Sequence, residues 1–264
     1  MKILKKGNYL FYFRENTADE DQLKLDLNMF FLPEYFLKSD DIIIDIGAHI
    51  GTFTIPIADK VSDGYVYSIE PCKESFEYLM KNISLNGLKN ISAHNIALTN
   101  FKGTTKLYYN PKGNWGDTIT KKFSDEGEII NTNTLENFLI ENNIKYCDFI
   151  KVNCEGAEFE IFLNSSKEVL SKIKLILISY HCDLNKEYNQ KKLIKHLIRC
   201  GFKTSVRNMS KDRGWIIARN INTYNHFSLI SKNIILKRMI DNKLERIIPK
   251  YIILKRMIAN KLRK

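Results

Sequence analysis

The sequence predicts an α/β protein built on a doubly wound, Rossmann-like sheet. From about residue 41, short apolar runs alternate with amphipathic stretches of helix length. The apolar runs are continuous, as in strands that are covered on both faces. Strands and helices in alternation give parallel strands joined by right-handed crossovers. A chain of 264 residues, 44% of them hydrophobic, can bury such a core.

The expected elements follow one another in order. The first strand, residues 42–46, is followed by a glycine turn and a short helix that runs through about Lys60. The second strand, residues 65–69, precedes a helix from about Lys73 to Asn86. Further strands are expected at residues 91–96, 147–152 and 175–180.

Two segments depart from this alternation. Residues 100–133 are rich in glycine and contain β-rich pieces at 104–109 and 128–131. They predict a hairpin-like insertion between the third and fourth parallel strands. Residues 202–206 and 214–218 predict a final strand pair, antiparallel at the sheet edge.

The chain therefore divides into three regions. Residues 1–40, which include an apolar run at 30–33, are expected to form a lead-in helix and a covering segment. Residues 41–222 form the main domain with its insertion, and residues 231–264 form a basic helical tail.

The net charge of +11 lies mostly in the tail. Residues 232–264 hold eleven basic and two acidic residues, a charge of +9, so residues 1–231 carry only +2. The argument for an anionic partner therefore applies to the tail alone, and nucleic-acid binding by the body is disfavoured.

The tail contains an internal repeat. Residues 234–244 recur with one change at residues 252–262, a period of 18 residues or five helical turns. Pro249 is expected to divide it into two short amphipathic helices with Lys and Arg on their polar faces. Such helices are typical of anionic membrane surfaces. Packing of the tail on itself or on the body, oligomerisation and nucleic-acid binding remain as alternatives.

A glycine turn follows the first strand, where open α/β sheets bind ligands. Gly47 and Gly51 allow the backbone to turn sharply and to approach a ligand closely. Asp45 stands where a dinucleotide-binding motif has its first glycine. A carboxylate there disfavours phosphate and suits a cationic ligand, such as the sulfonium and amine of S-adenosylmethionine.

An acid at the end of the second strand supports the same interpretation. Glu70 lies 25 residues after Asp45 and is followed by Pro71. In this kind of fold, an acid at that place accepts hydrogen bonds from the ribose hydroxyls of the ligand.

Together these motifs resemble those of the FkbM-type methyltransferases. The resemblance covers roughly residues 10–220 and is carried by residues 14–19, 45–53, 69–71, 95–99, 134–135, 149–158 and 180–181. It implies a class I methyltransferase fold, S-adenosylmethionine as methyl donor, and a hydroxyl acceptor on a sugar, polyketide or other small molecule. It also implies a set of cofactor contacts: Asp45, Gly47, Ala48, His49, Gly51, Thr52, Phe53, Glu70 for the ribose, Pro71, and Asn95 with Ala97 beside the adenine.

The sequence departs from the family at two places. Asn153 stands where the family usually has Asp, and Ser179 stands where an acid commonly precedes Tyr-His. Methyl transfer needs mainly alignment, and a hydroxyl acceptor also benefits from a general base. His181, Glu155 and Glu158 are the candidates for that base, whereas Asn153 is expected to hydrogen-bond the cofactor or the substrate.

Other residues carry weaker expectations. Trp115, between glycines of the insertion, is a candidate substrate contact, with packing of the insertion as the alternative. The five cysteines show no C-x-x-C spacing and predict reduced thiols, with no metal site. No signal peptide or membrane-spanning run is evident, so a cytoplasmic protein, peripheral at the membrane through its tail, is expected.

Three other functions compete with methylation of a small molecule. The departures at Asn153 and Ser179 fit a degenerate member that binds the cofactor or a partner without catalysis. A base-modifying amino methyltransferase would typically have prolines after Asn153, and this chain has none there. A nicotinamide dehydrogenase is disfavoured by Asp45.

Overall fold

The computed structural model describes residues 2–24, 35–110 and 116–224. The expected substrate contact Trp115, the apolar run at 30–33 and the tail from residue 231 lie outside the described residues. By internal contacts, residues 1–31 and 37–223 form one compact unit, so the N-terminal segment belongs with the main domain. No helix in the described ranges is long and apolar enough to cross a membrane.

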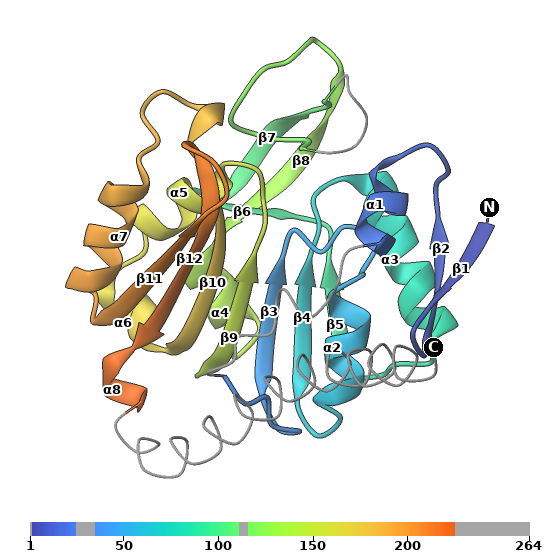
Figure 1. The fold of residues 1–264 in the computed structure, drawn as a ribbon, viewed down its shortest axis with the longest axis horizontal. Coiled ribbons are helices and arrows are strands. Elements are labelled where there is room, and N and C mark those ends of the chain that lie inside the picture. Colours follow the sequence, from blue (N-terminus) through green and yellow to red (C-terminus); the bar gives the residue numbers. More distant parts are fainter. Residues whose placement is uncertain (1, 25–34, 111–115, 225–264) are drawn as a thin grey trace, which may run out of the picture. The chain divides into compact units, whose positions relative to one another are not determined.

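The described core is a seven-stranded sheet with the order β11-β12-β10-β9-β3-β4-β5 (Figure 1). Its strands β3, β4, β5, β9 and β10 are parallel, and β12 runs antiparallel between β10 and β11. The bounds are β3 Ile42–Ile46, β4 Tyr65–Ile69, β5 Ile91–His94, β9 Cys147–Val152, β10 Ile173–His181, β11 Phe202–Asn208 and β12 Arg213–Asn220. The predicted doubly wound sheet and its final antiparallel pair are therefore confirmed.

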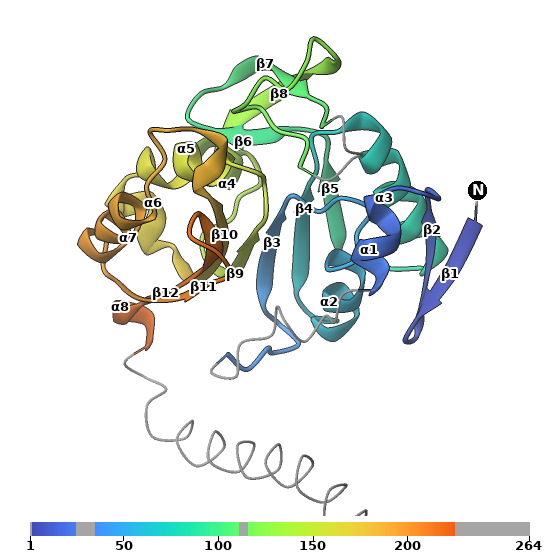
Figure 2. The same ribbon diagram turned by 45° about the horizontal axis from the view of Figure 1, so that its top comes forward.

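Helices cover both faces of the sheet (Figures 1 and 2). One face carries the largest apolar cluster, in which strand residues such as Ile150 pack against Phe138, Phe162 and Leu197. The helices on that side are α4 Leu135–Glu141, α5 Ala157–Leu163, α6 Lys167–Ser171 and α7 Gln190–Arg199. On the other side lie α2 Thr54–Lys60 and α3 Lys73–Leu85, and the short helix α8 Ile221–Tyr224 follows the last strand.

The predicted insertion is present as a separate three-stranded sheet. Its strands are β6 Ala97–Thr99, β7 Gly103–Tyr108 and β8 Gly127–Thr134, in the order β6-β8-β7. β7 and β8 are antiparallel, as expected of a hairpin, and β6 pairs with β8 in parallel. Figure 2 shows this sheet beyond the carboxyl ends of β3, β4 and β5, so the insertion stands over the edge at which ligands bind.

The N-terminal segment differs from the expectation. A hairpin of β1 Lys2–Lys6 and β2 Tyr9–Phe13 precedes the expected helix, which is α1 Ala18–Lys24. Phe11 and Phe13 are buried in a cluster with Leu23. Their spacing of two residues is the period of a strand with one covered face. A lead-in helix and a covering segment were expected over residues 1–40, and the hairpin that precedes the helix was not predicted.

Candidate active site

A pocket opens at the carboxyl edge of the parallel strands. Its walls come from α1, the loops after β3, β4 and β9, strands β6 and β7, and residues 116–119 of the insertion. It holds about 1020 Å³ of empty space, including its open mouth. We refer to the wall formed by residues 46–49, 52–53, 69–72 and 75 as the Gly47 side, and to the wall formed by residues 116–119, 153–155 and 157 as the Glu155 side.

Gly47 brings the turn after β3 against its two neighbouring strands. Its φ is +78°, and its N–H donates to the carbonyl of Ile69 at 2.9 Å. A Cβ at this position would lie 1.9 Å from the carbonyl oxygen of Asn153, so only glycine fits. Gly51 has φ +91° and packs toward Leu79, outside the pocket wall. Of the two expected glycines, Gly47 alone lines the pocket.

Asp45 lies beneath the turn and does not line the pocket. Its carboxylate is fully buried and accepts hydrogen bonds from Lys151 Nζ at 2.8 Å and Thr54 Oγ1 at 2.7 Å. Lys151 Nζ also donates to the carbonyl of Gly47 at 2.9 Å. The expected direct contact between Asp45 and a ligand is therefore corrected. Through Lys151, Asp45 holds the shape of the glycine turn.

Glu70 lies in the wall of the pocket at the end of β4, as expected. Its two carboxylate oxygens accept from the backbone N–H groups of His49 at 2.8 Å and Cys72 at 2.9 Å. Burial raises the pKa of Glu70 to about 7, although these two donors oppose the rise. Asn95 lies behind this wall and donates to the carbonyls of Glu70 and Pro71, both at 2.9 Å. Asn95 therefore orients the loop rather than lining the pocket.

The remaining expected residues of the Gly47 side line the pocket. Ala48, His49, Thr52, Phe53 and Pro71 all contribute to its wall. Ala97 lines it too, in an apolar stretch that also includes Leu98, Leu107 and Ile119. This stretch has the character expected of a wall for a flat apolar ring.

Glu155 is the main acid of the opposite wall. It follows β9 with a left-handed φ of +47°, and its side chain is 14% exposed. Its Oε1 lies 3.4 Å from His181 Nε2, and its Oε2 lies 3.6 Å from Arg213 Nη1. Oε2 is buried and has no hydrogen-bond partner within the described ranges. Burial raises the pKa of Glu155 above its ordinary value.

His181 and Glu158 lie behind Glu155 and do not line the pocket. Glu158 is fully buried and accepts from the backbone N–H of His181 at 2.7 Å and of Gly156 at 2.8 Å. Its Oε1 lies 3.1 Å from His181 Nδ1. Burial lowers the pKa of His181, but Glu158 and Glu155 more than offset this, so the net shift is upward. A carboxylate, an imidazole and a second carboxylate thus lie in a row ending at the pocket.

The insertion holds the backbone of Glu155. Thr118 Oγ1 donates to the Glu155 carbonyl, and Thr118 pairs with Tyr108 through both backbone groups. Next to it, Gly156 has φ +104°, and a Cβ there would lie 2.4 Å from Thr120 Oγ1. The conformation of the loop after β9 therefore depends on close packing against the insertion.

The two departures from the family pattern lie in different environments. Asn153 lines the pocket, and its backbone N–H donates to Ile46 at 2.9 Å. Ser179 lies on β10 and is 8% exposed, outside the pocket wall. Of the two, only Asn153 changes the chemistry of the wall itself.

Several residues at this site were missed by the sequence analysis. They are Lys151, a buried cation in β9, Thr118 and Asp117 of the insertion, and Arg14 and Asp19 of the N-terminal segment, which had been noted only for the family resemblance. Lys151 gave a usable signal, because a cation within a buried strand needs an anionic partner. The others depend on contacts between segments that are distant in sequence.

Comparison with known proteins identifies relatives of this chain. The family model described as "Methyltransferase FkbM domain" matches residues 45–204. Methyltransferase 1 of Beauveria bassiana is 26% identical over 164 residues, which cover 54% of this chain and 66% of that protein. Methyltransferase sdnD of Sordaria araneosa is 24% identical over 173 residues, which cover 54% of this chain and 67% of that protein. The chain thus spans about two thirds of the length of these relatives.

Solved structures show a weaker resemblance. Fibrillarin of Methanococcus jannaschii has a TM-score of 0.47 and 17% identity, with coverage of 83% of this chain and 81% of that one. M. jannaschii TYW2, solved in complex with AdoMet, has a TM-score of 0.42 and 17% identity, with coverage of 83% and 86%. Scores of this size say nothing about the substrate of this chain.

Proposed function

This chain belongs to the FkbM methyltransferase family, and on that premise we propose that it transfers a methyl group from S-adenosylmethionine to a hydroxyl of a sugar or another small molecule. The observation that carries the hydroxyl assignment is Glu155, an acid in the pocket wall. Its Oε2 is buried and lies within ion-pair distance of Arg213, but it lacks a hydrogen-bond partner in the described part of the chain. A buried acceptor of this kind calls for a donor, and a substrate hydroxyl supplies one.

The Gly47 side fits S-adenosylmethionine, the methyl donor of the family. Glu70 lies in the pocket wall, which supports a role as acceptor for the ribose hydroxyls, and a carboxylate there disfavours a pyrophosphate. Gly47 allows close approach of the ligand to the turn, beside Thr52 and Phe53. Ala97 and Leu98 belong to the apolar wall that suits an adenine ring.

The bound cofactor supplies an electrophilic methyl group on a sulfonium, which is already a good leaving group. The protein then has to align the hydroxyl and accept its proton. We assign proton acceptance to Glu155 Oε2. Because His181 lies 3.4 Å behind the other oxygen of Glu155, an imidazolium there stabilises the carboxylate before the transfer. Glu158 fixes the imidazole, and Asn153 offers hydrogen bonds to the bound molecules.

A labelled-methyl assay over a panel of sugars and other hydroxyl compounds tests this proposal. With an accepted substrate, Glu155→Gln should lower kcat by roughly 10²–10⁴-fold, the usual contribution of a general base. Glu168→Gln, an exposed acid in α6, is the matched control and should leave kcat unchanged. Full activity of the Glu155→Gln variant would show that Glu155 is not the general base.

The alternative is a member of the family that binds the cofactor without catalysis. It is favoured by Asn153, which places an amide in the wall where the family usually has an acid. A single-turnover experiment separates the two functions, because a degenerate member transfers no label to any acceptor. Under that alternative, Asn153→Asp should create activity that the wild type lacks.

For the tail, residues 232–264, we propose binding to an anionic membrane surface, with a cytoplasmic protein held peripherally at the membrane. Its net charge of +9 and its 18-residue amphipathic repeat support this proposal. Self-association through the tail is the main competing possibility.

A further inference from the structure

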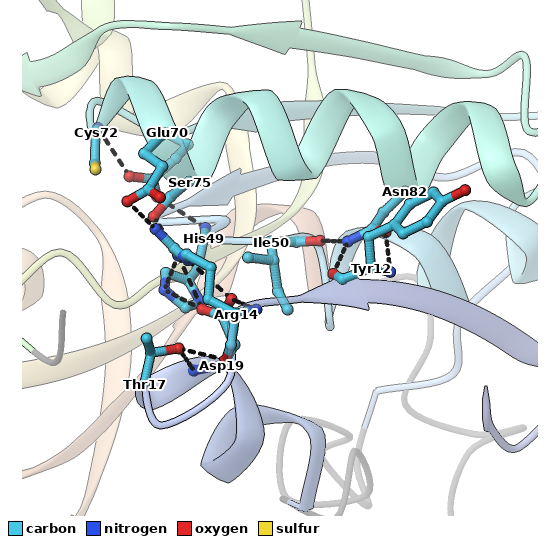
Figure 3. A network of polar contacts seen from close by, with 11 residues as sticks. Tyr12, Arg14, Thr17, Asp19, His49, Ile50, Glu70, Cys72, Ser75 and Asn82 are labelled. Atoms are coloured by element: carbon cyan, nitrogen blue, oxygen red, sulfur yellow. Dashed lines mark hydrogen bonds and ion pairs between the residues drawn. The ribbon is translucent and has the colours of Figure 1, made fainter. Parts of the chain in front are cut away.

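A polar network joins the N-terminal segment to the Gly47 side of the pocket (Figure 3). Asp19 in α1 is fully buried and accepts from Arg14 through the backbone N–H at 2.8 Å, Nε at 2.9 Å and Nη2 at 2.9 Å. Arg14 also reaches α3, where it donates to Ser75 Oγ at 3.0 Å and to Glu74 Oε2 at 2.9 Å. The segment 14–19 is therefore fixed against α3.

The same segment reaches the pocket in two ways. Ala18 and Gln22 of α1 line the pocket directly. Asp19 contacts His49, a residue of the pocket wall, whose Nε2 lies 3.3 Å from Asp19 Oδ1. These residues precede residues 45–204, the region that the family model matches, although residues 14–19 contribute to the resemblance seen in the sequence.

The contacts of His49 decide which ring nitrogen carries the proton. Arg14 Nη2 lies 3.4 Å from His49 Nε2, but its two hydrogens have closer acceptors in Asp19 at 2.9 Å and Ser75 at 3.0 Å. The hydrogen between His49 and Asp19 therefore belongs to Nε2, which leaves Nδ1 as an acceptor. Burial lowers the pKa of His49 to about 4, partly opposed by Asp19, so the ring is neutral at pH 7.

The acceptor on His49 has no donor in the protein as described. Nδ1 is buried and lacks a hydrogen-bond partner among the described residues. The backbone N–H of the same residue donates to Glu70, the acid assigned to the ribose. A buried acceptor beside the ribose acid, in a pocket wall, calls for a donor from a ligand.

We infer that the N-terminal segment completes the cofactor site, with Asp19 positioning His49 so that Nδ1 accepts a hydrogen bond from bound S-adenosylmethionine. This inference rests on the proposed function. Two groups of the cofactor have the required chemistry, the α-ammonium group and a ribose hydroxyl. They can be told apart because 5′-methylthioadenosine keeps the ribose and lacks the amino-acid part.

Calorimetry with S-adenosylhomocysteine and 5′-methylthioadenosine tests the role of His49. Glycine tolerates the φ of +53° at this position, so His49→Gly removes the acceptor without backbone strain. It should weaken S-adenosylhomocysteine binding by about tenfold or more. His49→Asn retains a side-chain oxygen near the position of Nδ1 and also tolerates this φ, so it should bind within about threefold of wild type.

The two probes separate the donors. If His49→Gly weakens the binding of S-adenosylhomocysteine alone, the donor to Nδ1 is the α-ammonium group. If it weakens the binding of both probes, the donor is a ribose hydroxyl. If His49→Gly binds both probes as tightly as wild type, the inference is wrong while the proposed function stands. If wild type binds neither probe, the proposed function fails as well.

Asp19→Asn tests the positioning step. An amide can donate to Nε2, which moves the ring proton to Nδ1 and converts the acceptor into a donor. Binding of S-adenosylhomocysteine should therefore weaken about tenfold. Glu74→Gln is the matched control, because it also removes an anionic partner of Arg14, is 64% exposed and has no contact with His49 in the described structure. Equal weakening by the two variants would contradict the role of Asp19.

Discussion

The two sides of the pocket are held in place by different means. On the Gly47 side, the turn is fixed by its own strands: Gly47 bonds to β4, and Lys151 on β9 joins Asp45 to the turn. On the Glu155 side, the loop after β9 is fixed by Thr118 of the insertion, which is distant in sequence, and by Glu158 in the helix that follows the loop. The turn at Gly47 is therefore held by the sheet, whereas the loop that carries Glu155 depends on the insertion as well.

This difference corresponds to the two proposed roles, cofactor binding on the Gly47 side and acceptor binding on the Glu155 side. Cofactor binding is shared across a family, so it is served by a rigid turn and one strand-end acid. Acceptor binding varies, and loops carried by a constant scaffold are where such variation concentrates. Changes beneath the Gly47 side should therefore affect folding and cofactor affinity, whereas changes near Glu155 should affect turnover.

The largest expected effect is on stability, from Lys151→Met. This change leaves the Asp45 carboxylate buried without its cation, at a cost of about 3–5 kcal/mol in the free energy of unfolding. Lys174→Met is the control, since Lys174 pairs with Asp148 at 3.2 Å in a more exposed position and should cost about 1 kcal/mol or less. Urea unfolding measures both, and equal costs would contradict the role given to the buried pair.

The next effect is a pH dependence of cofactor affinity. Burial raises the pKa of Glu70 to about 7, and ribose donors favour its charged form, so binding should release a proton. Affinity should fall by up to about tenfold for each pH unit below 7 and be flat well above it. Calorimetry in buffers of different ionisation enthalpy checks the proton release. The dependence should be absent in Glu70→Gln, and its persistence there would assign it to another group.

A smaller effect is expected at Thr118. Thr118→Val keeps the shape of the side chain and removes the hydrogen bond to the Glu155 carbonyl, so kcat should fall about three- to tenfold. Thr118→Ser should restore the rate, because it retains the hydroxyl. Steady-state kinetics with an accepted substrate and calorimetry with S-adenosylmethionine provide the two readouts. Loss of cofactor affinity in Thr118→Val would show that the two sides are not independent.

The smallest effect on the pocket should come from the tail. Deletion of residues 232–264 should abolish co-sedimentation with anionic liposomes and leave the cofactor affinity unchanged, because all described residues that line the pocket precede the tail in sequence. Binding of the full chain should also fall with added salt. Equal liposome binding by the truncated protein would end the membrane proposal.

Much of the fold could be predicted from the sequence because its strands are continuous apolar runs. Residues 42–46, 65–69 and 147–152 form strands at the predicted bounds. The hairpin at the N-terminus was missed because its apolar run is short and its partner strand is exposed. Its burial comes from residues of other segments, Leu23 of α1, Ile50 and Ile55 near α2, and Tyr78 of α3, which a local pattern does not reveal.

The site was predicted in part for a similar reason. Gly47 and Glu70 could be placed in the wall because strand ends in a parallel sheet share one edge. Asp45 was assigned to the ligand, but strand register sets it opposite Lys151, and that pairing depends on which strands are neighbours. The contacts of Thr118 with Glu155 and of Asp19 with His49 depend on tertiary packing in the same way.

The most direct test of the central claim is calorimetry of S-adenosylmethionine with three proteins: wild type, Glu70→Gln and Glu155→Gln. We expect wild type and Glu155→Gln to bind alike, because Glu155 serves the acceptor. Glu70→Gln should bind about tenfold or more weakly, because it loses a charged acceptor for the ribose. Equal weakening by both variants, or binding of NADH in place of S-adenosylmethionine, would contradict the account.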